Sequence, residues 1–339
     1  MTTIFDVAKM ANVSIGTVSR YLNNKKLRED NHKRVEQAIK ELNYKVDNSA
    51  RTLKTKTSYT VGFVACTLNT VIVLDIIQGL DTTLVEYGYN LIVASTLNNI
   101  ELERKKIMLL EQKKIDGLIY MVHQQSHLLL EDLNRLQENG IPVILVNCDI
   151  PEFECDKVFV DNINGTYNAI EYLINQGHRN IACMYYHNNE STMTERYEGY
   201  KRALQDYNIP LNPKYVIEGP YDRSGNVMDQ IEALFKMDNR PSAIFTSSFD
   251  YTFMAMEVFK TLKMEIGKDI SFIGFDQITF NHLLDKQIST VKEPSYEVGV
   301  VAAKTLLKRL ENKNDPLKIF RLKTQMEITE SVQTFGSMI

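Results

Sequence analysis

The sequence of 339 residues lacks the features that mark several classes of protein. No apolar run approaches the roughly 18–20 residues that a membrane-spanning helix needs. The N-terminus, MTTIFDVAKM, has no basic segment followed by an apolar one, so no secretory signal is expected. The four cysteines contain no CxxC pair, a pattern that favours reduced thiols. We therefore expect a cytoplasmic protein that does not bind a membrane.

Motifs of common enzymes and cofactor sites are also missing. The chain has no GxGxxG after a predicted strand, no GxxxxGK[ST] phosphate loop and no GxSxG nucleophile elbow. His123 and His127 are four residues apart, but no acidic or thiolate partner lies beside them, so two solvated surface histidines are the simpler interpretation. We expect a protein that is not an enzyme and that holds neither a cofactor nor a metal ion.

The net charge of -4 hides an asymmetry along the chain. Residues 1–60 carry 12 Lys and Arg against six Asp and Glu, which gives +6. The remaining residues carry 27 basic and 37 acidic side chains, which gives -10. A basic segment joined to an acidic body is typical of a chain whose basic part meets a polyanion.

Residues 4–23, IFDVAKMANVSIGTVSRYLN, have the pattern of a helix-turn-helix. Two short amphipathic stretches flank Asn12, which tolerates a left-handed turn, and Ser14, which can cap the second helix. In this motif the second helix enters the major groove with its N-terminal residues toward the base edges. A small helical bundle without a role in DNA binding is the alternative, and the basic excess and polar outward face disfavour it. The residues predicted to face DNA are Ser14, Ile15, Gly16, Thr17, Ser19 and Arg20.

The residue pattern changes after the helix-turn-helix segment. Residues 45–58 are polar and basic and read as a linker. From Tyr59 on, short apolar runs rich in β-formers alternate with amphipathic helices, which indicates βαβ units and parallel, helix-covered sheets. Two such sheets in series are expected, followed by a long helix over about 296–310 and a final β stretch over 319–329.

The segment DVAKMANVSIGTVSRYLN, followed by KRVEQAIKELNYKVDNSARTLKTKTSYTVGFV, resembles the LacI/GalR family of bacterial transcription regulators. This resemblance runs from about Thr3 to the end of the chain. It implies an α/β fold class, with an N-terminal all-α helix-turn-helix domain and a two-subdomain core of doubly wound parallel sheets, similar to periplasmic binding proteins. The implied boundaries are 1–46 for the DNA-binding domain, 47–58 for the hinge, 59–162 plus about 291–322 for the first subdomain, and 163–290 plus about 323–339 for the second.

The resemblance also gives the linker a role. In this family the hinge becomes helical on operator DNA, and a dimer inserts leucines into the minor groove, where such apolar wedges kink the duplex. An ordinary linker leucine is the alternative for Leu53, and it is weakened by the polar neighbours. The family implies a homodimer on double-stranded operator DNA. The further DNA-contacting residues that it implies are Asn23, Asn48, Ser49, Arg51 and Leu53.

Candidate effector residues follow from where the predicted strands end. Doubly wound sheets bind ligands at the carboxyl ends of their strands, and Asp276 directly follows the apolar run SFIGF. A helix cap or loop acid is the alternative for Asp276, a cap for Asp161 or Asp250, and a surface arginine for Arg196. The effector-binding residues that the resemblance implies are Thr192, Arg196, Tyr221, Asp250, Asp276 and Asp161.

Two positions depart from the family pattern. Gly16 occupies a base-facing position and offers no side chain for base recognition. Where relatives commonly carry an NPFF-like aromatic step after the first strand of the core, residues 69–73 read NTVIV. An aromatic wall is therefore missing there, and we expect an unusual effector or a pocket completed by Phe249, Tyr221 or Phe275.

The sequence thus predicts a repressor, most simply of a carbohydrate-utilisation operon, that is controlled by a sugar or a sugar derivative. Two alternatives lie within the family: a co-repressor-dependent, purine-repressor-like regulator, and a catabolite-control-like regulator that depends on a partner protein. A solute-binding transport protein would share the core but would have no use for residues 1–58.

Overall fold

A computed structural model describes most of the chain, which divides into two compact units, residues 1–59 and 60–339. The described residues are 2–22, 26–44, 57–121, 126–147, 149–186, 191–219 and 225–336.

The described residues of the smaller unit form three helices. Its helices are α1 (Ile4–Met10), α2 (Ile15–Leu22) and α3 (Glu29–Glu41). Thr3 and Asp6 form a reciprocal capping box at the start of α1. The helices share one small apolar core, which consists of Val7, Ala8, Ala11, Val18, Val35 and Ala38. Because most of these side chains are small, the helices can pack closely in a short chain.

The turn between α1 and α2 confirms the sequence prediction. Asn12 has φ +49°, in the left-handed region that asparagine tolerates better than most residues. The Ser14 hydroxyl accepts a hydrogen bond from the Thr17 backbone N–H at 3.2 Å, as an N-cap does. The helix-turn-helix geometry therefore follows from two local side-chain choices.

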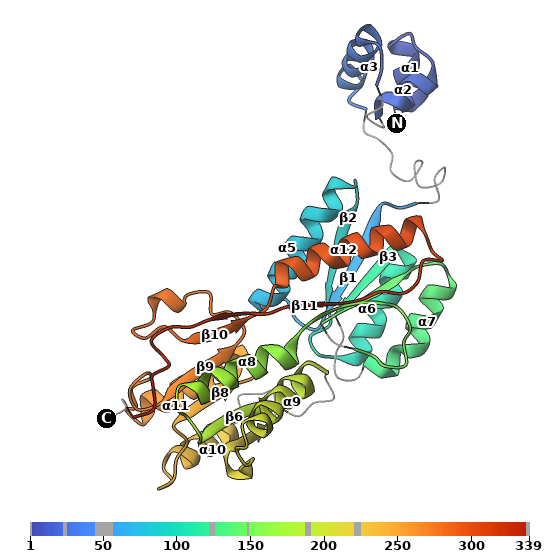
Figure 1. Ribbon diagram of the computed structural model, residues 1–339. Coiled ribbons are helices and arrows are strands. Elements are labelled where there is room, and N and C mark those ends of the chain that lie inside the picture. Colours follow the sequence, from blue (N-terminus) through green and yellow to red (C-terminus); the bar gives the residue numbers. More distant parts are fainter. Residues whose placement is uncertain are drawn as a thin grey trace. The chain divides into compact units, whose positions relative to one another are not determined.

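The larger unit holds two sheets that each have six strands within the described residues. The first sheet has the order β11-β5-β4-β3-β1-β2, and all of its strands are parallel. Its strands are β1 (Thr60–Ala65), β2 (Asn90–Ser95), β3 (Gly117–Met121), β4 (Val143–Val146), β5 (Asp156–Val160) and β11 (Ile319–Leu322). The helices of this half are α5 (Val71–Glu86), α6 (Ile100–Gln112), η1 (Ser126–Leu129), α7 (Leu130–Glu138) and α12 (Ser295–Glu311) (Figure 1).

The second sheet has the order β12-β10-β9-β8-β6-β7 and is parallel except for the antiparallel pair of β10 and β12. Its strands are β6 (Ile181–Tyr186), β7 (Val216–Gly219), β8 (Ala243–Thr246), β9 (Ser271–Phe275), β10 (Ser289–Lys292) and β12 (Gln325–Glu327). The helices of this half are α8 (Asn162–Asn175), α9 (Ser191–Asp206), η2 (Pro213–Tyr215), α10 (Gly225–Phe235), α11 (Phe249–Thr261) and η3 (Asn281–Leu283). The expected α/β fold class is confirmed.

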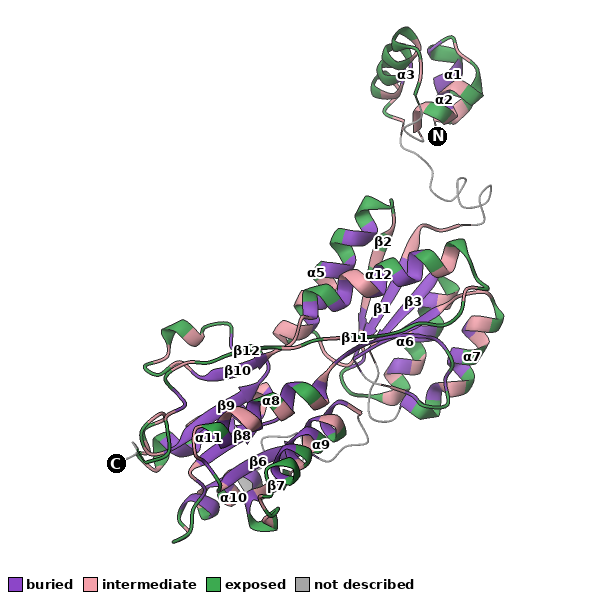
Figure 2. Cartoon of the chain, viewed as in Figure 1, coloured by how far each residue is buried: buried purple, intermediate pink, exposed green. Residues whose placement is uncertain are grey.

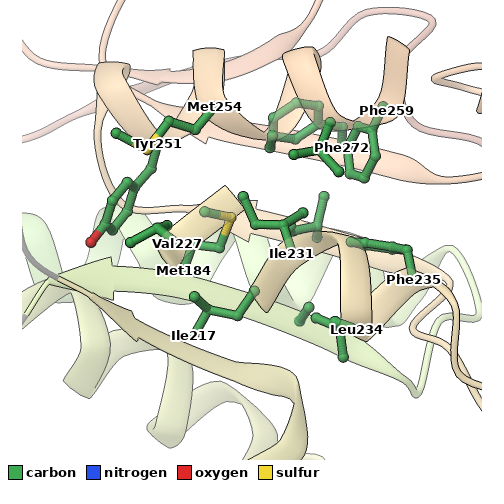
Figure 3. Packing of buried hydrophobic residues seen from close by; sticks show 14 of the residues in the cluster. Met184, Ile217, Val227, Ile231, Leu234, Phe235, Tyr251, Met254, Phe259 and Phe272 are labelled. Atoms are coloured by element: carbon green, nitrogen blue, oxygen red, sulfur yellow. The ribbon is translucent and has the colours of Figure 1, made fainter. Parts of the chain in front are cut away.

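Both halves bury their central strands under helices (Figure 2). In the second half, α10 and α11 face the sheet across an apolar cluster that includes Ile231, Phe235, Phe259 and Phe272 (Figure 3). The rings of Phe235 and Phe259 meet edge to face at 4.9 Å between centroids. Such buried aromatic contacts hold the helices, and with them the loops that follow the strands.

The chain passes between the two halves three times. It crosses after β5, again between β10 and α12, and finally between β11 and β12. The β stretch expected over 319–329 consists of two short strands, β11 and β12, which join different sheets. Residues next to these crossings can contact side chains of both halves.

Helices α5 and α12 cross at a pair of glycines. A Cβ on Gly79 would lie 2.1 Å from the Tyr296 carbonyl oxygen, and one on Gly299 would lie 2.2 Å from the Ile76 carbonyl oxygen. The backbones approach so closely that no side chain fits at either position. This crossing fixes α12, and therefore the connection that leads to it from β10.

Within the described part of the chain, no helix has the length and apolar character needed to span a membrane.

Candidate functional site

The first candidate site is the outward face of α2. Ser14, Ile15, Gly16 and Arg20 are exposed, whereas Val18 points into the small core. Ile15 is 41% exposed, which is high for a large apolar side chain in a helix. An isoleucine beside hydroxyls and an arginine matches the mixture of methyl contacts and hydrogen bonds that reads base edges.

Of the remaining predicted DNA contacts, two lie on α2 and the others lie outside the described residues. Thr17 and Ser19 are half-buried on the same helix. The Thr17 hydroxyl lies 3.0 Å from the Ser14 hydroxyl, so the two form one polar group at the start of α2. Five predicted residues lie outside the described residues, namely Asn23, Asn48, Ser49, Arg51 and Leu53.

The second candidate site is centred on Arg196 in the first turns of α9, whose side chain is only 4% exposed. Its Nε donates to Asn162 Oδ1 at 2.9 Å. Its Nη1 donates to the Ser247 carbonyl oxygen at 2.7 Å. The guanidinium carbon lies 3.6 Å from the centre of the Phe275 ring, a cation–π distance. The alternative of a surface arginine is therefore excluded.

Asp276 is a buried acidic partner of this arginine. Its Oδ1 lies 3.3 Å from Arg196 Nη1, and its Oδ2 accepts from the Phe249 backbone N–H, the first residue of α11, at 3.0 Å. Asp276 therefore forms an ion pair with Arg196 and also accepts a hydrogen bond from the first turn of α11, so its two expected roles are both present. Asp276 has φ +81°, a strained conformation that the surrounding contacts must hold. Burial raises the pKa of its carboxyl above the ordinary value, and Arg196 opposes that rise.

Glu293 is a second acidic partner, at the crossing between β10 and α12. Its carboxylate accepts from Arg196 Nη2, and its side chain is 3% exposed. Asn147, the residue after β4 in the first sheet, places its Nδ2 3.5 Å from Glu293 Oε2. Burial raises the pKa of Glu293 to about 7, and the negative charge of Asp276 adds to the rise, while Arg196 lowers it.

The other predicted effector residues lie near this cluster or at helix starts. Thr192 is buried in the first turn of α9. Asp161 caps α8 by accepting from the Asn164 backbone N–H at 3.3 Å. Asp250 is half-buried in the first turn of α11, and its charge contributes to the raised pKa of Asp276. Tyr221 lies outside the described residues.

Two expectations about aromatic walls have different outcomes. Phe275 does not complete an open pocket, because its side chain is fully buried and lies against Arg196. Phe249 is half-buried, and its ring lies 4.6 Å from that of Phe253. Thr70 caps α5 by accepting from the Val73 backbone N–H, so the segment in place of an aromatic step begins a helix.

Within the described residues, no cluster of three or more His, Cys, Asp or Glu side chains could hold a metal ion.

Two more residues complete the cluster, and one of them, Glu293, was not singled out by the sequence. Glu293 lies in VKEPSYEV, where an acid before a proline reads as an exposed loop. Asn162 joins the cluster to a further ion pair, since its Nδ2 donates to Glu195 Oε2 at 3.1 Å and Glu195 pairs with Arg321 of β11 at 2.9 Å.

Comparison with known proteins assigns both sites to one family. Residues 3–47 match the family described as "Bacterial regulatory proteins, lacI family". Residues 58–326 match that described as "Periplasmic binding proteins and sugar binding domain of LacI family".

Individual relatives cover nearly the whole chain. The chain is 30% identical over 334 residues to the "HTH-type transcriptional repressor PurR" of Vibrio vulnificus (strain CMCP6), which covers 98% of this chain and 99% of that protein. Among solved structures, the lac repressor dimer bound to operator and the anti-inducer ONPF has a TM-score of 0.81 at 20% identity and covers 98% of this chain and 99% of that one. The complex of the regulator CelR with cellobiose has a TM-score of 0.72 at 24% identity, and the match covers 98% of this chain and 100% of that one.

Proposed function

Because this chain belongs to the LacI family and is a DNA-binding transcriptional repressor of that family, we propose that a homodimer of it binds a pseudo-palindromic operator and responds to a small sugar-like effector at the Arg196 cluster. The observation that carries the effector site is a convergence of strand ends. Asn147 follows β4, Ser247 follows β8 and Asp276 follows β9, and all three reach the same group of side chains. Ligands bind at such carboxyl ends in doubly wound sheets.

A sugar fits this cluster better than a flat base does. Hydroxyl groups can donate hydrogen bonds, and the cluster presents carboxylate and amide oxygens that accept them. A base needs an exposed ring for stacking, but Phe275 is buried and residues 69–73 supply no aromatic side chain. The description of the matching family as a sugar-binding domain supports the same choice.

A nucleobase co-repressor is the second candidate, and the relatives favour it. Several curated relatives at 29–30% identity are named PurR. Phe249 is the aromatic side chain of the described residues that such a ligand could use, because it is half-buried next to Asp276.

The response to an effector follows from differential binding. Glu293 and Asn147 join Arg196 to residues of the other half of the core, so a ligand that takes over any of these contacts favours one arrangement of the halves. An effector shifts the equilibrium only as far as its affinity differs between the two arrangements.

Exposed apolar side chains in both halves support a homodimer. Leu74 on α5 is 54% exposed. Phe280, which precedes η3, is 65% exposed, and Leu283, the last residue of η3, is 71% exposed. We take Phe280 and Leu283, which are three residues apart in the chain, as part of the apolar surface that a second copy covers. A Leu283→Glu variant should reduce the dimer fraction in light scattering, whereas the exposed polar substitution Lys268→Glu should not.

The function is tested by fluorescence anisotropy with labelled palindromes from upstream of the gene itself. Arg20→Ala should weaken specific binding by about tenfold or more, as expected for the loss of one base or phosphate contact. Lys33→Ala, an exposed substitution on α3, is the control and should leave specific binding within about twofold. Equal losses in both variants would contradict the assignment of α2 as the recognition helix.

A further inference from the structure

The Arg196 cluster contains more buried acid than base. Arg196, Asp276 and Glu293 have side chains that are 4%, 8% and 3% exposed. Both acids contact the same guanidinium, so one cation faces two carboxyl groups. Buried charges are tolerated when they are paired, and among the described residues the two carboxyl groups form salt bridges with the same cation, Arg196.

Arg196 has little capacity left to bind a ligand. Its Nε is engaged by Asn162, its Nη1 by Ser247 and Asp276, and its Nη2 by Glu293. A guanidinium has five N–H groups and no acceptor. A ligand that enters this cluster therefore meets acceptors rather than free donors.

One buried acceptor in the cluster is unused. Asn147 is 6% exposed, and its Oδ1 has no hydrogen-bond partner among the described residues. Its Nδ2 is directed at Glu293 Oε2 at 3.5 Å, so the amide lies beside the second carboxyl group. An acceptor that is buried without a partner is costly, and a donor supplied by a ligand removes this cost.

The ionisation of Glu293 agrees with this charge balance. Its pKa is raised to about 7 by burial and by Asp276, with Arg196 acting in the opposite direction. Asp250, in the first turn of α11, adds another negative charge on the side of Asp276. A positive charge next to Glu293 would stabilise its ionised form.

We propose that the effector is an amino sugar, whose ammonium group binds between the Glu293 carboxylate and Asn147 Oδ1. An ammonium group has three donors and no acceptor, so it satisfies both groups and neutralises the excess charge. A neutral hydroxyl can donate one hydrogen bond but leaves the charge unbalanced. This inference rests on the proposed function, because it takes the Arg196 cluster as the effector site.

Isothermal titration of the full chain tests the proposal with matched probes. D-Glucosamine and D-galactosamine carry the amine, D-glucose and D-galactose replace it with a hydroxyl, and N-acetyl-D-glucosamine removes its charge. At least one amino sugar should bind about tenfold or more tightly than both its neutral partner and, for glucosamine, the acetylated form. Glu293→Gln should reduce that preference to about threefold or less, whereas the exposed Glu311→Gln should preserve it.

Three results would overturn the proposal: no amino sugar binds, a neutral sugar or a purine base binds at least as tightly, or Glu293→Gln leaves the preference intact. Thermal unfolding checks that each variant is folded, and the comparison of amine with N-acetyl ligand in the wild type needs no variant. Operator binding is measured on the same preparations. Operator release by a neutral sugar or a base overturns the inference alone, whereas failure to bind any operator overturns the proposed function.

Discussion

Arg196 on α9 and Glu293, between β10 and α12, form a buried ion pair. Glu293 also lies next to Asn147 at the end of β4, so this pair connects an element of the second half with residues that border the first. Glu293 lies two residues before the start of α12, a helix that packs tightly against α5 at Gly79 and Gly299. Under the proposed function, this ion pair is a connection through which an effector acts on the arrangement of the core.

Removal of the arginine leaves two buried carboxyl groups without their cation. Arg196→Met should lower the free energy of unfolding of the core by about 3–5 kcal/mol at pH 7.5. The loss should be smaller at pH 5.5, because the raised pKa of Glu293, about 7, lets a proton neutralise that group. Urea unfolding of the full chain, followed by circular dichroism, measures both values. Arg202→Met, on the exposed part of α9, is the control, and a loss below about 1 kcal/mol or a loss independent of pH would be inconsistent with this account.

Glu103 gives the first half of the core its own pH dependence. This residue of α6 is 1% exposed, and its Oε1 accepts from the hydroxyls of Tyr120 and Ser126. Its Oε2 has no partner among the described residues, and burial raises its pKa from 4.5 to about 7. The folded state thus keeps a proton that the unfolded state releases, so the stability from this group is complete below pH 4.5 and is lost as the pH rises through 7.

Glu103→Gln should remove this dependence. The difference in unfolding free energy between variant and wild type should shift in favour of the variant by up to roughly 3 kcal/mol from pH 4.5 to pH 8. Other titrating groups, such as Glu293 and His178, contribute the same pH dependence to both proteins, so their contributions cancel in the difference of unfolding free energies. The exposed Glu101→Gln is the matched control on the same helix. A constant difference across this range would show that Glu103 does not hold its proton in the folded state.

The glycine crossing of α5 and α12 predicts a steric effect. Gly299→Ala places a Cβ 2.2 Å from the Ile76 carbonyl oxygen, so the helices must separate. We expect a loss of about 1–3 kcal/mol in unfolding free energy, a typical cost of overpacking. Lys304→Ala, an exposed change on the same helix, should stay within about 0.5 kcal/mol. Similar stability of both variants would mean that α12 is not fixed by this crossing.

Gly16 allows recognition and stability to be separated. A Cβ at this position has an ordinary contact of 3.7 Å with the Ser14 hydroxyl, so alanine fits. Gly16→Ala should stabilise α2 by about 1 kcal/mol and slow its amide exchange about fivefold, as measured by mass spectrometry of the full chain. Because the new methyl group lies on the proposed recognition face of α2, operator affinity should change even though the helix is more stable. Unchanged exchange and unchanged affinity together would contradict the exposed position of Gly16 in a helix that contacts DNA.

Local patterns predicted much of the fold from the sequence. Asn12 and Ser14 determine the turn of the helix-turn-helix through their own backbone and side-chain preferences, and both predictions were confirmed. The alternation of apolar runs and amphipathic helices likewise gave the correct fold class. The β pattern of 319–329 alone does not show that the segment is two strands of different sheets, and only the subdomain boundary implied at about 322 by the resemblance separates them.

The sequence did not indicate which acidic side chains are buried. Glu103 lies in ELERKK and Glu293 in VKEPSYEV, where charged neighbours or a proline indicate a solvated surface. Their burial depends on contacts across the fold, with Tyr120 of β3 for the first and with Arg196 of α9 for the second. Arg196 and Asp276 could be nominated only through a family resemblance and a strand end, and the structure brings them together at 3.3 Å.

The central claim, a repressor whose operator binding is controlled at the Arg196 cluster, is tested most directly by one titration. The full chain is titrated into a labelled operator palindrome and into random DNA at 150 mM salt, with and without the amino sugar, D-glucosamine or D-galactosamine, that it binds more tightly. We expect the operator to be bound at least about 1,000-fold more tightly than random DNA. We also expect this amino sugar to change the operator affinity, and this change to be lost in Glu293→Gln. Equal binding of operator and random DNA, no response to the amino sugar, or a response that persists in Glu293→Gln would contradict the account.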